Sequence, residues 1–302
     1  MVKGFRVLVL GYGRMGHAMQ RLLSPQHTLC FWDCNPQPGL KSIDLEQSAS
    51  QADFVLFCIP VNPHREIASR LAPFLSKQCI CLSIAKGLDE NGYTAARIFS
   101  DVFGNTHFYG LLYGPMIAEN IIADQAGFAQ LGYSEQSVPK QVMALFDHTT
   151  LYIRPSTDAT GISWAVILKN VYAMLFGIAD ELHLGDNMRG FLAVQTLEEL
   201  DAIVQGMGGK VRTPWHLAGL GDLITTATSP GSHHHDLGRK LARGEIFNLT
   251  GEGVHTLEMV DKHKLFDSSA YPLYRLIHDF VHEPRDIKKQ LRTYLESEFN
   301  PD

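Results

Sequence analysis

A glycine-rich turn between a buried strand and a helix constrains the fold of this chain more than any other feature. Residues 5–10, FRVLVL, form a short apolar run that is typical of a buried parallel strand. Gly11-x-Gly13-x-x-Gly16 follows and leads into a segment with helical spacing. In this motif the first glycine allows a tight turn, the second lets backbone approach a pyrophosphate, and the third lets helix and strand pack closely. The turn therefore predicts a phosphate site at a helix N-terminus.

An acidic residue at the end of the next apolar run extends this interpretation. Asp33 ends the run at 27–33, where an acid that binds the ribose of a dinucleotide is expected. A carboxylate accepts a hydrogen bond from a ribose 2′-hydroxyl and repels a 2′-phosphate. Because no arginine follows at 34 or 35, NAD is favoured over NADP, although Arg14 could itself reach a phosphate. The residues expected to bind the dinucleotide here are Gly11, Tyr12, Gly13, Arg14, Met15, Gly16 and Asp33.

Apolar runs alternate with helical patterns through the first half of the chain. Further strands are predicted at 53–60, 79–87, 107–115, 126–133 and 149–155, with a loop at 34–44. This alternation implies a parallel, doubly wound sheet. After Pro155, helices are predicted at 157–184, 187–207, 234–243, 253–264, 270–282 and 285–297. We therefore expect an α/β chain, with a Rossmann-like dinucleotide-binding domain over 1–154 and an all-helical domain over 155–302.

Composition excludes several classes of protein. The 302 residues carry a formal net charge of -6, so no broad basic surface for nucleic acid is expected. No apolar run reaches the roughly 20 residues of a membrane span, and the first residues lack a signal-peptide layout. The five cysteines indicate reduced thiols in a cytoplasmic protein. No metal site is expected, because Cys79-x-Cys81 lacks ligand spacing and the consecutive histidines at 233–235 rarely point to one centre.

The second half opens with a long apolar segment, residues 161–185, that has a single lysine in its middle. A helix that is apolar nearly all round is buried. A buried lysine costs several kcal/mol unless its charge is paired or its pKa falls. The segment alone is compatible with a catalytic Lys169 and with a structural lysine that reaches solvent. The residues expected on one face of this helix are Lys169, Ala173, Phe176, Asp180 and His183.

Five segments together resemble the NAD(P)-dependent glycerol-3-phosphate dehydrogenases. They are AKG at 85–87, GPMIAE at 114–119, G-x7-KNV at 161–171, GLGDLITT at 219–226 and EGVHT at 252–256, in the order and separation of the family pattern. The resemblance runs through nearly the whole chain. It implies a Rossmann-like domain followed by a helical domain with the active site between them. It also implies hydride transfer between NAD(H) and glycerol 3-phosphate or dihydroxyacetone phosphate, and a homodimer.

The same resemblance implies roles for individual residues. Lys169 matches the general acid/base, Asp222 an acid near it, and Lys86 a lysine that reaches substrate and nicotinamide. For Asp222, a helix N-cap role is equally compatible. An ammonium can polarise a ketone and then supply its oxygen with a proton. Positions that bind substrate are matched by Asn170, Thr226, Gly114, Met116, Ser232, His233 and His234. Cofactor positions outside the glycine turn are matched by Pro60, Lys86, Ala118 and Glu252.

The chain departs from the family pattern where a substrate phosphate is expected. The family usually has Ser-Arg-Asn, and this chain has Ser232-His233-His234. Arginine is always charged and binds phosphate with two hydrogen bonds, whereas imidazole is mostly neutral at pH 7 and makes a single contact. Three interpretations stay open. They are a divergent glycerol-3-phosphate dehydrogenase, a related dehydrogenase of a non-phosphorylated hydroxy acid, and a dinucleotide-binding protein without turnover.

Overall fold

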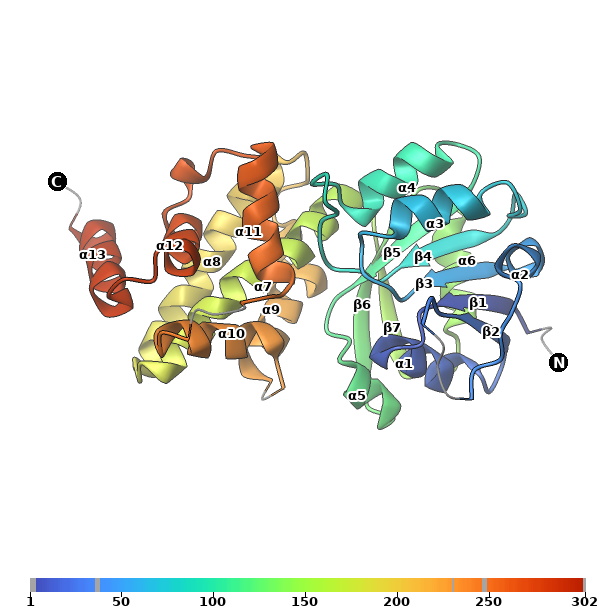
Figure 1. Cartoon of the computed structure of the whole chain (residues 1–302), viewed down its shortest axis with the longest axis horizontal. Coiled ribbons are helices and arrows are strands. Elements are labelled where there is room, and N and C mark those ends of the chain that lie inside the picture. Colours follow the sequence, from blue (N-terminus) through green and yellow to red (C-terminus); the bar gives the residue numbers. More distant parts are fainter. Residues whose placement is uncertain (1–3, 36–38, 230, 246–248, 301–302) are drawn as a thin grey trace. The chain divides into compact units, whose positions relative to one another are not determined.

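The computed structural model describes residues 4–35, 39–229, 231–245 and 249–300 (Figure 1). Residues 36–38 of the predicted loop at 34–44, and residues 1–3 of the amino-terminal segment, lie outside the described residues. The chain divides into two compact units, unit 1 (Met1–Ser163) and unit 2 (Trp164–Asp302). The sequence predicts a boundary between 154 and 155, whereas the division falls inside helix α7 (Ala159–Glu181).

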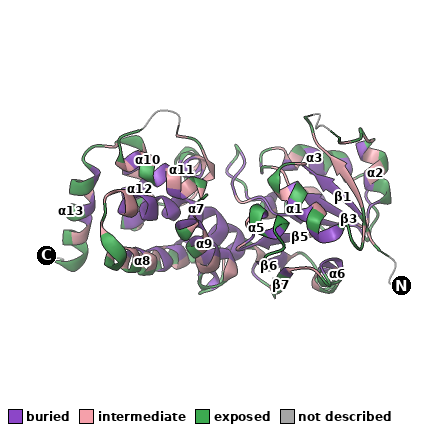
Figure 2. Ribbon diagram, turned by 90° about the horizontal axis from the view of Figure 1, so that it is seen from below, coloured by how far each residue is buried: buried purple, intermediate pink, exposed green. Residues whose placement is uncertain are grey.

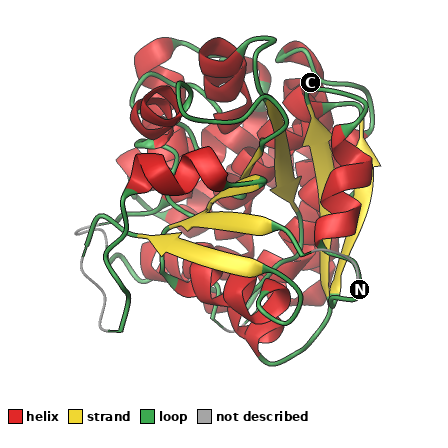
Figure 3. Ribbon diagram, turned by 90° about the vertical axis from the view of Figure 1, so that its right-hand side faces the viewer, coloured by secondary structure: helices red, strands yellow, loops and turns green. Residues whose placement is uncertain are grey.

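Unit 1 contains a seven-stranded sheet with the order β2-β1-β3-β4-β5-β6-β7, flanked by helices (Figure 3). All seven predicted strands are present. They are β1 (Arg6–Leu10), β2 (Thr28–Trp32), β3 (Phe54–Phe57), β4 (Ile80–Ser83), β5 (Phe108–Tyr113), β6 (Gly127–Tyr133) and β7 (Leu151–Ser156). The helices are α1 (Arg14–Leu23), α2 (Leu45–Gln51), α3 (His64–Leu71), α4 (Ala95–Phe103), α5 (Ala118–Ile122) and α6 (Val138–Leu145). Strands β3 and β4 are buried along their whole length, as their predominantly apolar sequences predict.

Two strands, β6 and β7, run against the predicted parallel arrangement. Strands β1 to β5 pair in parallel, but β6 is antiparallel to β5 and parallel to β7. The connection from β5 to β6 contains only the five-residue helix α5. Such a helix is about 7.5 Å long at roughly 1.5 Å per residue. It is too short to carry the chain back along the strand for a parallel crossover, so the chain returns in the opposite direction.

Within the described residues, unit 2 is built from helices and helical turns. The long helices after α7 are α8 (Gly185–Gly206), α10 (His233–Ala242), α11 (Glu252–His263), α12 (Pro272–His282) and α13 (Ile287–Phe299). Each corresponds to a helix predicted from the sequence. A further short helix, α9 (Asp222–Thr228), follows a π-helical turn at Leu217–Gly221 and was not predicted. The glycines of this segment, LAGLG, are typical of a loop, so its helical character depends on tertiary packing.

Helix α7 forms the core of unit 2. Every residue from 161 to 179 is buried (Figure 2). By length and mean hydropathy, 1.6, α7 would also be able to cross a membrane, so the expectation that no apolar run reaches this length was wrong. Its apolar window is entirely buried inside the protein, as in core helices of soluble proteins. The helix ends at Glu181, and His183 has a positive φ of 55° beyond it, so the predicted five-residue face loses its last member.

Candidate functional site

The glycine-rich turn of unit 1 has the geometry that its sequence predicts. Gly11 has φ 94°, and a Cβ there would lie 2.6 Å from the Cys58 carbonyl oxygen. A Cβ at Gly16 would lie 2.2 Å from the Gly11 carbonyl oxygen, so helix α1 and the turn are in backbone contact. At Gly13, the N-cap of α1, a Cβ would meet nothing within 4 Å. The turn is therefore closed on the protein side and open at the helix N-terminus, where N–H groups and the helix dipole favour an anion.

Two further members of the turn are held by side-chain contacts. Tyr12 donates its hydroxyl to the Gln20 side chain at 2.9 Å, and its ring packs on His17 with centroids 4.1 Å apart. Arg14, which could reach a phosphate, forms an ion pair with Glu119 at 3.3 Å. Both of these side chains are more than half exposed, and such a pair contributes at most about 1 kcal/mol. The guanidinium of Arg14 can therefore exchange this partner for an anionic ligand at little cost.

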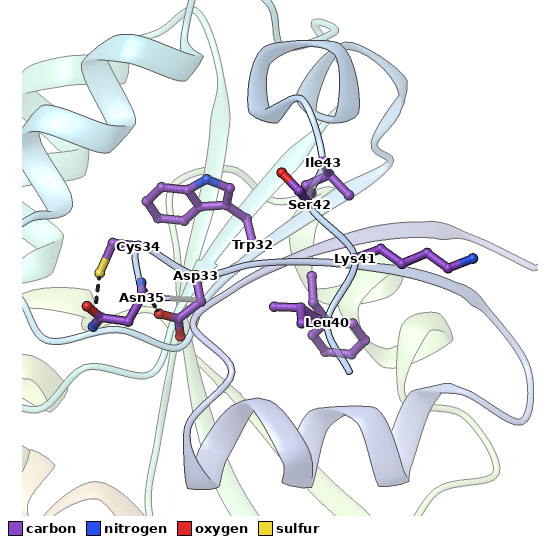
Figure 4. Close-up of a pocket in the computed structure, with 9 residues that line it drawn as sticks. Trp32, Asp33, Cys34, Asn35, Leu40, Lys41, Ser42 and Ile43 are labelled. Carbon is purple, nitrogen blue, oxygen red and sulfur yellow. Dashed lines mark hydrogen bonds between the residues drawn. The ribbon is translucent and has the colours of Figure 1, made fainter. Parts of the chain in front are cut away.

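Asp33 connects the glycine turn to the end of β2. One carboxylate oxygen accepts the Tyr12 backbone N–H at 2.8 Å, and the other accepts the Asn35 backbone N–H at 2.8 Å. Each oxygen has a second lone pair that can accept from a ribose hydroxyl. Asp33 lies in a pocket of about 190 Å³ (Figure 4). The residues that line the pocket are Phe31, Trp32, Asp33, Cys34, Asn35, Leu40, Lys41, Ser42 and Ile43.

Lys41 is a pocket residue that the sequence analysis missed. It is exposed, and its side chain extends away from Asp33 (Figure 4). Sequence patterns place the expected cation only in the two positions that follow Asp33. Lys41 comes six positions after Asn35 and lines the same pocket. The sequence alone does not reveal that the chain returns there. The pocket thus combines a carboxylate, which suits a ribose 2′-hydroxyl, with an ammonium, which suits a 2′-phosphate.

Lys86 and Gly114 of the predicted site are in direct contact. The Lys86 ammonium donates to the Gly114 carbonyl oxygen at 3.0 Å. Gly114 has φ 151°, and a Cβ there would lie 2.5 Å from the Phe128 carbonyl oxygen, so this turn requires glycine. Met116 and Ala118, by contrast, are each only 6% exposed and belong to the apolar core of unit 1. The structure therefore places these two predicted site residues mainly in packing contacts.

A buried histidine supports this region of unit 1. His64 donates from Nδ1 to the Pro60 carbonyl oxygen at 2.9 Å, so its Nε2, 2.9 Å from the Ser83 hydroxyl, accepts a hydrogen bond. Burial lowers the pKa of His64 to about 4, so the ring is neutral at pH 7. Through these bonds His64 joins the predicted cofactor residue Pro60 to the end of β4, three positions before Lys86. No sequence pattern indicates this role for His64.

In unit 2, Lys169 is the centre of a buried polar cluster. Its ammonium lies 3.1 Å from Asp222 Oδ2, and the two side chains are 5% and 4% exposed. The ammonium also donates to the Thr226 hydroxyl at 2.5 Å, and that hydroxyl donates to the Asp222 carbonyl oxygen at 2.7 Å. Asn170, the next residue on α7, is 2% exposed. The alternative of a lysine that extends to solvent is therefore wrong, and Lys169 is a buried, paired cation.

The turn before α9 sets the position of Asp222. A Cβ at Gly219 would lie 2.1 Å from the Pro214 carbonyl oxygen, so only glycine permits this π-helical turn. Gly221 is the N-cap of α9 and Asp222 is its first residue, so the predicted N-cap role belongs to the neighbouring glycine. A carboxylate in the first turn of a helix is stabilised by the helix dipole. Both Asp222 and Thr226, one turn later, thus face Lys169 from a single short helix.

The three consecutive histidines have three different environments. Ser232 caps α10 by accepting the His235 backbone N–H at 3.3 Å. His233 is exposed and donates from Nε2 to the Thr250 carbonyl oxygen at 2.6 Å. His234 accepts the Gly253 backbone N–H at 3.3 Å. A Cβ at Gly253 would also lie 2.8 Å from the backbone oxygen of Asn170, so His234 lies next to the segment that carries Lys169.

His235 is turned to another part of unit 2. It is buried, and its Nε2 donates to Asp180 at 2.8 Å, which also forms an ion pair with Arg189 at 2.5 Å. Helices α7 and α10 touch there through backbone, since a Cβ at Gly177 would lie 2.0 Å from the His235 carbonyl oxygen. Lys169 and Asp180, which share a predicted polar face, therefore have separate partners.

Glu252 begins helix α11 next to the Gly253 contact. Its carboxyl is partly buried, and desolvation raises its pKa. Of the predicted residues in unit 2, the structure brings together Lys169, Asp222 and Thr226, and separately His234 with the start of α11, where Gly253 also lies against the Asn170 backbone. The unit thus contains a buried ammonium with a fixed partner and a nearby histidine-containing surface.

A Rossmann-type sheet with a phosphate-binding turn, followed by a helical unit with a buried lysine and aspartate, defines the class of two-unit nicotinamide-dependent dehydrogenases. The model of the NAD-dependent glycerol-3-phosphate dehydrogenase C-terminus matches residues 158–292, and the model of the N-terminus matches residues 36–138. The chain belongs to the NAD-dependent glycerol-3-phosphate dehydrogenase family.

Individual relatives agree with this assignment. A glycerol-3-phosphate dehydrogenase (NAD(P)+) from Teredinibacter turnerae is 31% identical over 95% of this chain and 93% of that protein. One from Saccharophagus degradans is 30% identical over 100% of this chain and 93% of that protein. The fold is similar to the crystal structure of glycerol-3-phosphate dehydrogenase from Coxiella burnetii, with a TM-score of 0.83 at 23% identity, covering 97% and 99% of the two chains.

Proposed function

We propose that this chain interconverts glycerol 3-phosphate and dihydroxyacetone phosphate with NAD(H), with NADP(H) as a further cofactor, and that Lys169 is the general acid/base. The observation that carries the proposal is the buried ammonium of Lys169, held by Asp222 and Thr226 in a chain of this family. Both matched family models describe glycerol-3-phosphate dehydrogenases, which favours this reaction over the hydroxy-acid and non-catalytic alternatives.

The residues of unit 2 account for the proton in this reaction. When the ketone of dihydroxyacetone phosphate is reduced, the bound cofactor supplies a hydride to the carbonyl carbon, and the carbonyl oxygen needs a proton. The Lys169 ammonium polarises the oxygen and donates that proton, and the neutral amine takes a proton back in the reverse direction. Asp222 and Thr226 hold the amine in one position, because it pairs with the carboxylate of the first and donates to the hydroxyl of the second. Asn170 is the neighbouring polar group for orienting substrate.

The residues of unit 1 account for cofactor binding. The open N-terminus of α1 accepts the pyrophosphate, and Asp33 accepts from the adenosine ribose in the pocket at the end of β2. The ammonium of Lys86 is fixed by the Gly114 carbonyl oxygen and adds positive potential for an anionic substrate. The NAD preference follows from Asp33, and Lys41 allows NADP as a weaker alternative.

The histidine segment defines how the substrate phosphate is bound. His234 lies beside the helix that carries Lys169, and His233 is exposed at the start of α10. These imidazoles replace a permanently charged arginine and an amide, so we expect weaker binding of phosphate than in relatives with Ser-Arg-Asn. His233→Arg should lower the KM for dihydroxyacetone phosphate without a matching change in KM for NADH.

The direct test is oxidation of NADH by purified protein with dihydroxyacetone phosphate as the oxidant. The proposal predicts loss of NADH absorbance that depends on this substrate and is absent with unphosphorylated dihydroxyacetone at the same concentration. Turnover of unphosphorylated keto acids without turnover of dihydroxyacetone phosphate would replace it with the hydroxy-acid alternative. Tight binding of NADH with no turnover of any of these compounds would replace it with the non-catalytic alternative.

A cytoplasmic location and a homodimer are part of the same proposal. All five cysteines are free thiols, as expected in a reducing compartment. The homodimer rests on the family resemblance. Light scattering of the purified protein as it elutes from a size-exclusion column should give twice the chain mass of 33.6 kDa. A mass equal to that of a single chain would exclude the dimer.

A further inference from the structure

Helices α11 and α12 bring three metal-ligating side chains together in a part of unit 2 that the proposed reaction does not use. His278 and His282 are one turn apart on α12, with ring centroids 4.3 Å apart. Asp261 of α11 lies opposite, with Oδ2 2.7 Å from His278 Nε2. One ligand atom from each of the three side chains lies within 4.8 Å of the other two. We propose that Asp261, His278 and His282 form a binding site for a divalent transition metal ion, with Zn²⁺ as the best fit.

The orientation of His278 supports a ligand role beyond simple proximity. Its Nε2 is directed at Asp261, and its Nδ1 lies 3.3 Å from an oxygen of Asp279. With Nε2 as the ligand, Nδ1–H donates to the Asp279 carboxylate. This carboxylate–histidine–metal arrangement fixes the ring and raises its basicity in many metal sites. Asp279 therefore supplies the hydrogen bond that orients the ligand histidine, which an isolated pair of exposed histidines lacks.

The donor set selects the class of ion. Two imidazoles with one carboxylate suit Zn²⁺ and its neighbours in the transition series, whereas Mg²⁺ and Ca²⁺ prefer oxygen ligands alone. Zn²⁺ binds such donors at about 2.0–2.2 Å, which places tetrahedral ligand atoms about 3.3 Å apart. The ion would replace the direct hydrogen bond between Asp261 and His278, and these two groups would separate by less than 1 Å. Water fills the fourth position.

The site is accessible and bridges two helices. The side chain of Asp261 is 45% exposed, that of His278 is 27% exposed, and His282 is exposed. The buried face of α12, which includes Leu273, Ile277 and Phe280, packs in the core and leaves the two histidines at its margin. An ion there would tie α12 to α11, the helix that begins at Glu252. Asp261 and His278 are 17 positions apart, which is why the sequence analysis predicted no metal site.

Calorimetric titration of ZnCl₂ into the chelator-treated full-length protein tests the proposal. We expect one binding event at this site, weakened at least tenfold in His282→Ala and in Asp261→Asn. His148→Ala is the matched control, because His148 also lies 3.3 Å from an aspartate on the surface but belongs to no group of three potential ligands among the described residues. It should bind Zn²⁺ like the unaltered protein. Circular dichroism and NADH oxidation confirm that each variant is folded.

Three results would overturn the proposal. The first is the absence of any Zn²⁺ binding by the unaltered protein at neutral pH. The second is binding that is unchanged in the His278→Ala/His282→Ala double variant, which would assign the ion to another group such as the histidines at 233–235. Because protons compete with the metal for imidazole, affinity should also fall when the pH is lowered from 7.5 to 5.5. An affinity that does not change over this range would contradict histidine ligation.

Discussion

In unit 1 the candidate cofactor site is made mostly of backbone, whereas in unit 2 the candidate catalytic site is made of buried charged side chains. The turn at Gly11, Gly13 and Gly16 leaves N–H groups open at a helix end, and Asp33 holds that turn by accepting the Tyr12 backbone N–H. Lys169 and Asp222 instead depend on each other inside an apolar helix cluster. A mutation at the cofactor site of unit 1 should therefore act mainly through shape, and one at the Lys169 cluster of unit 2 through uncompensated charge.

The largest expected effect is the loss of one partner from the buried ion pair. Asp222→Leu leaves the Lys169 ammonium buried without its carboxylate and should lower the free energy of unfolding by about 3–5 kcal/mol. The double variant Lys169→Met/Asp222→Leu should regain much of this stability, because no unpaired charge remains, but should stay inactive. Urea unfolding of the single and double variants measures both effects. Equal loss in the two variants would show that packing, not charge, dominates.

The next largest effect is a pH dependence of the protein's stability that arises from His64 in unit 1. The pKa of His64 is about 4 in the folded protein against an ordinary 6.5. Above pH 6.5 the ring is neutral in both states and carries no penalty. Between pH 6.5 and about 4 the unfolded chain takes up a proton that the folded protein does not, so stability should fall by about 3 kcal/mol. Urea unfolding at several pH values should show a shallower decline in His64→Asn, and identical slopes would contradict this role.

Two glycine substitutions distinguish a steric effect on phosphate binding from a steric effect on the stability of the fold. Gly13→Ala adds a methyl group in open space, so it should leave the melting temperature unchanged but raise the Kd for NADH about tenfold, roughly 1.4 kcal/mol. Gly16→Ala places the same group 2.2 Å from a backbone oxygen and should also lower the melting temperature. Fluorescence titration and thermal melts compare them. A Gly13→Ala protein that binds NADH normally would mean that the phosphate is bound elsewhere.

The smallest effect concerns the choice of cofactor. Lys41 is exposed, and an exposed charge contributes at most about 1 kcal/mol, so Lys41→Ala should weaken the use of NADPH about two- to fivefold with little change for NADH. Steady-state kcat/KM for the two cofactors measures this ratio. Lys77→Ala, which removes another lysine of unit 1, is the control. A ratio that moves equally in both variants would exclude a specific role for Lys41.

Local sequence patterns predicted most of the fold because each strand and long helix has its own apolar period. These patterns did not predict features that depend on the length of a connection or on contacts between residues far apart in the sequence. The short connection around α5 reverses β6, and packing on Pro214 makes a helical turn from a glycine segment that is typical of a loop. The glycine turn and Lys169 were visible because their chemistry is local. His64, Lys41 and the Asp180–His235 pair were not, since their partners come from other elements.

If Lys169 donates the proton to the substrate, its loss slows the chemical step itself, and the kcat of Lys169→Ala with dihydroxyacetone phosphate and saturating NADH measures that step. We expect a fall of about 10²–10⁴-fold in kcat with the Kd for NADH unchanged, because cofactor binding is assigned to unit 1. Lys169→Ala protein that remains folded and retains near-normal kcat would show that another group donates the proton.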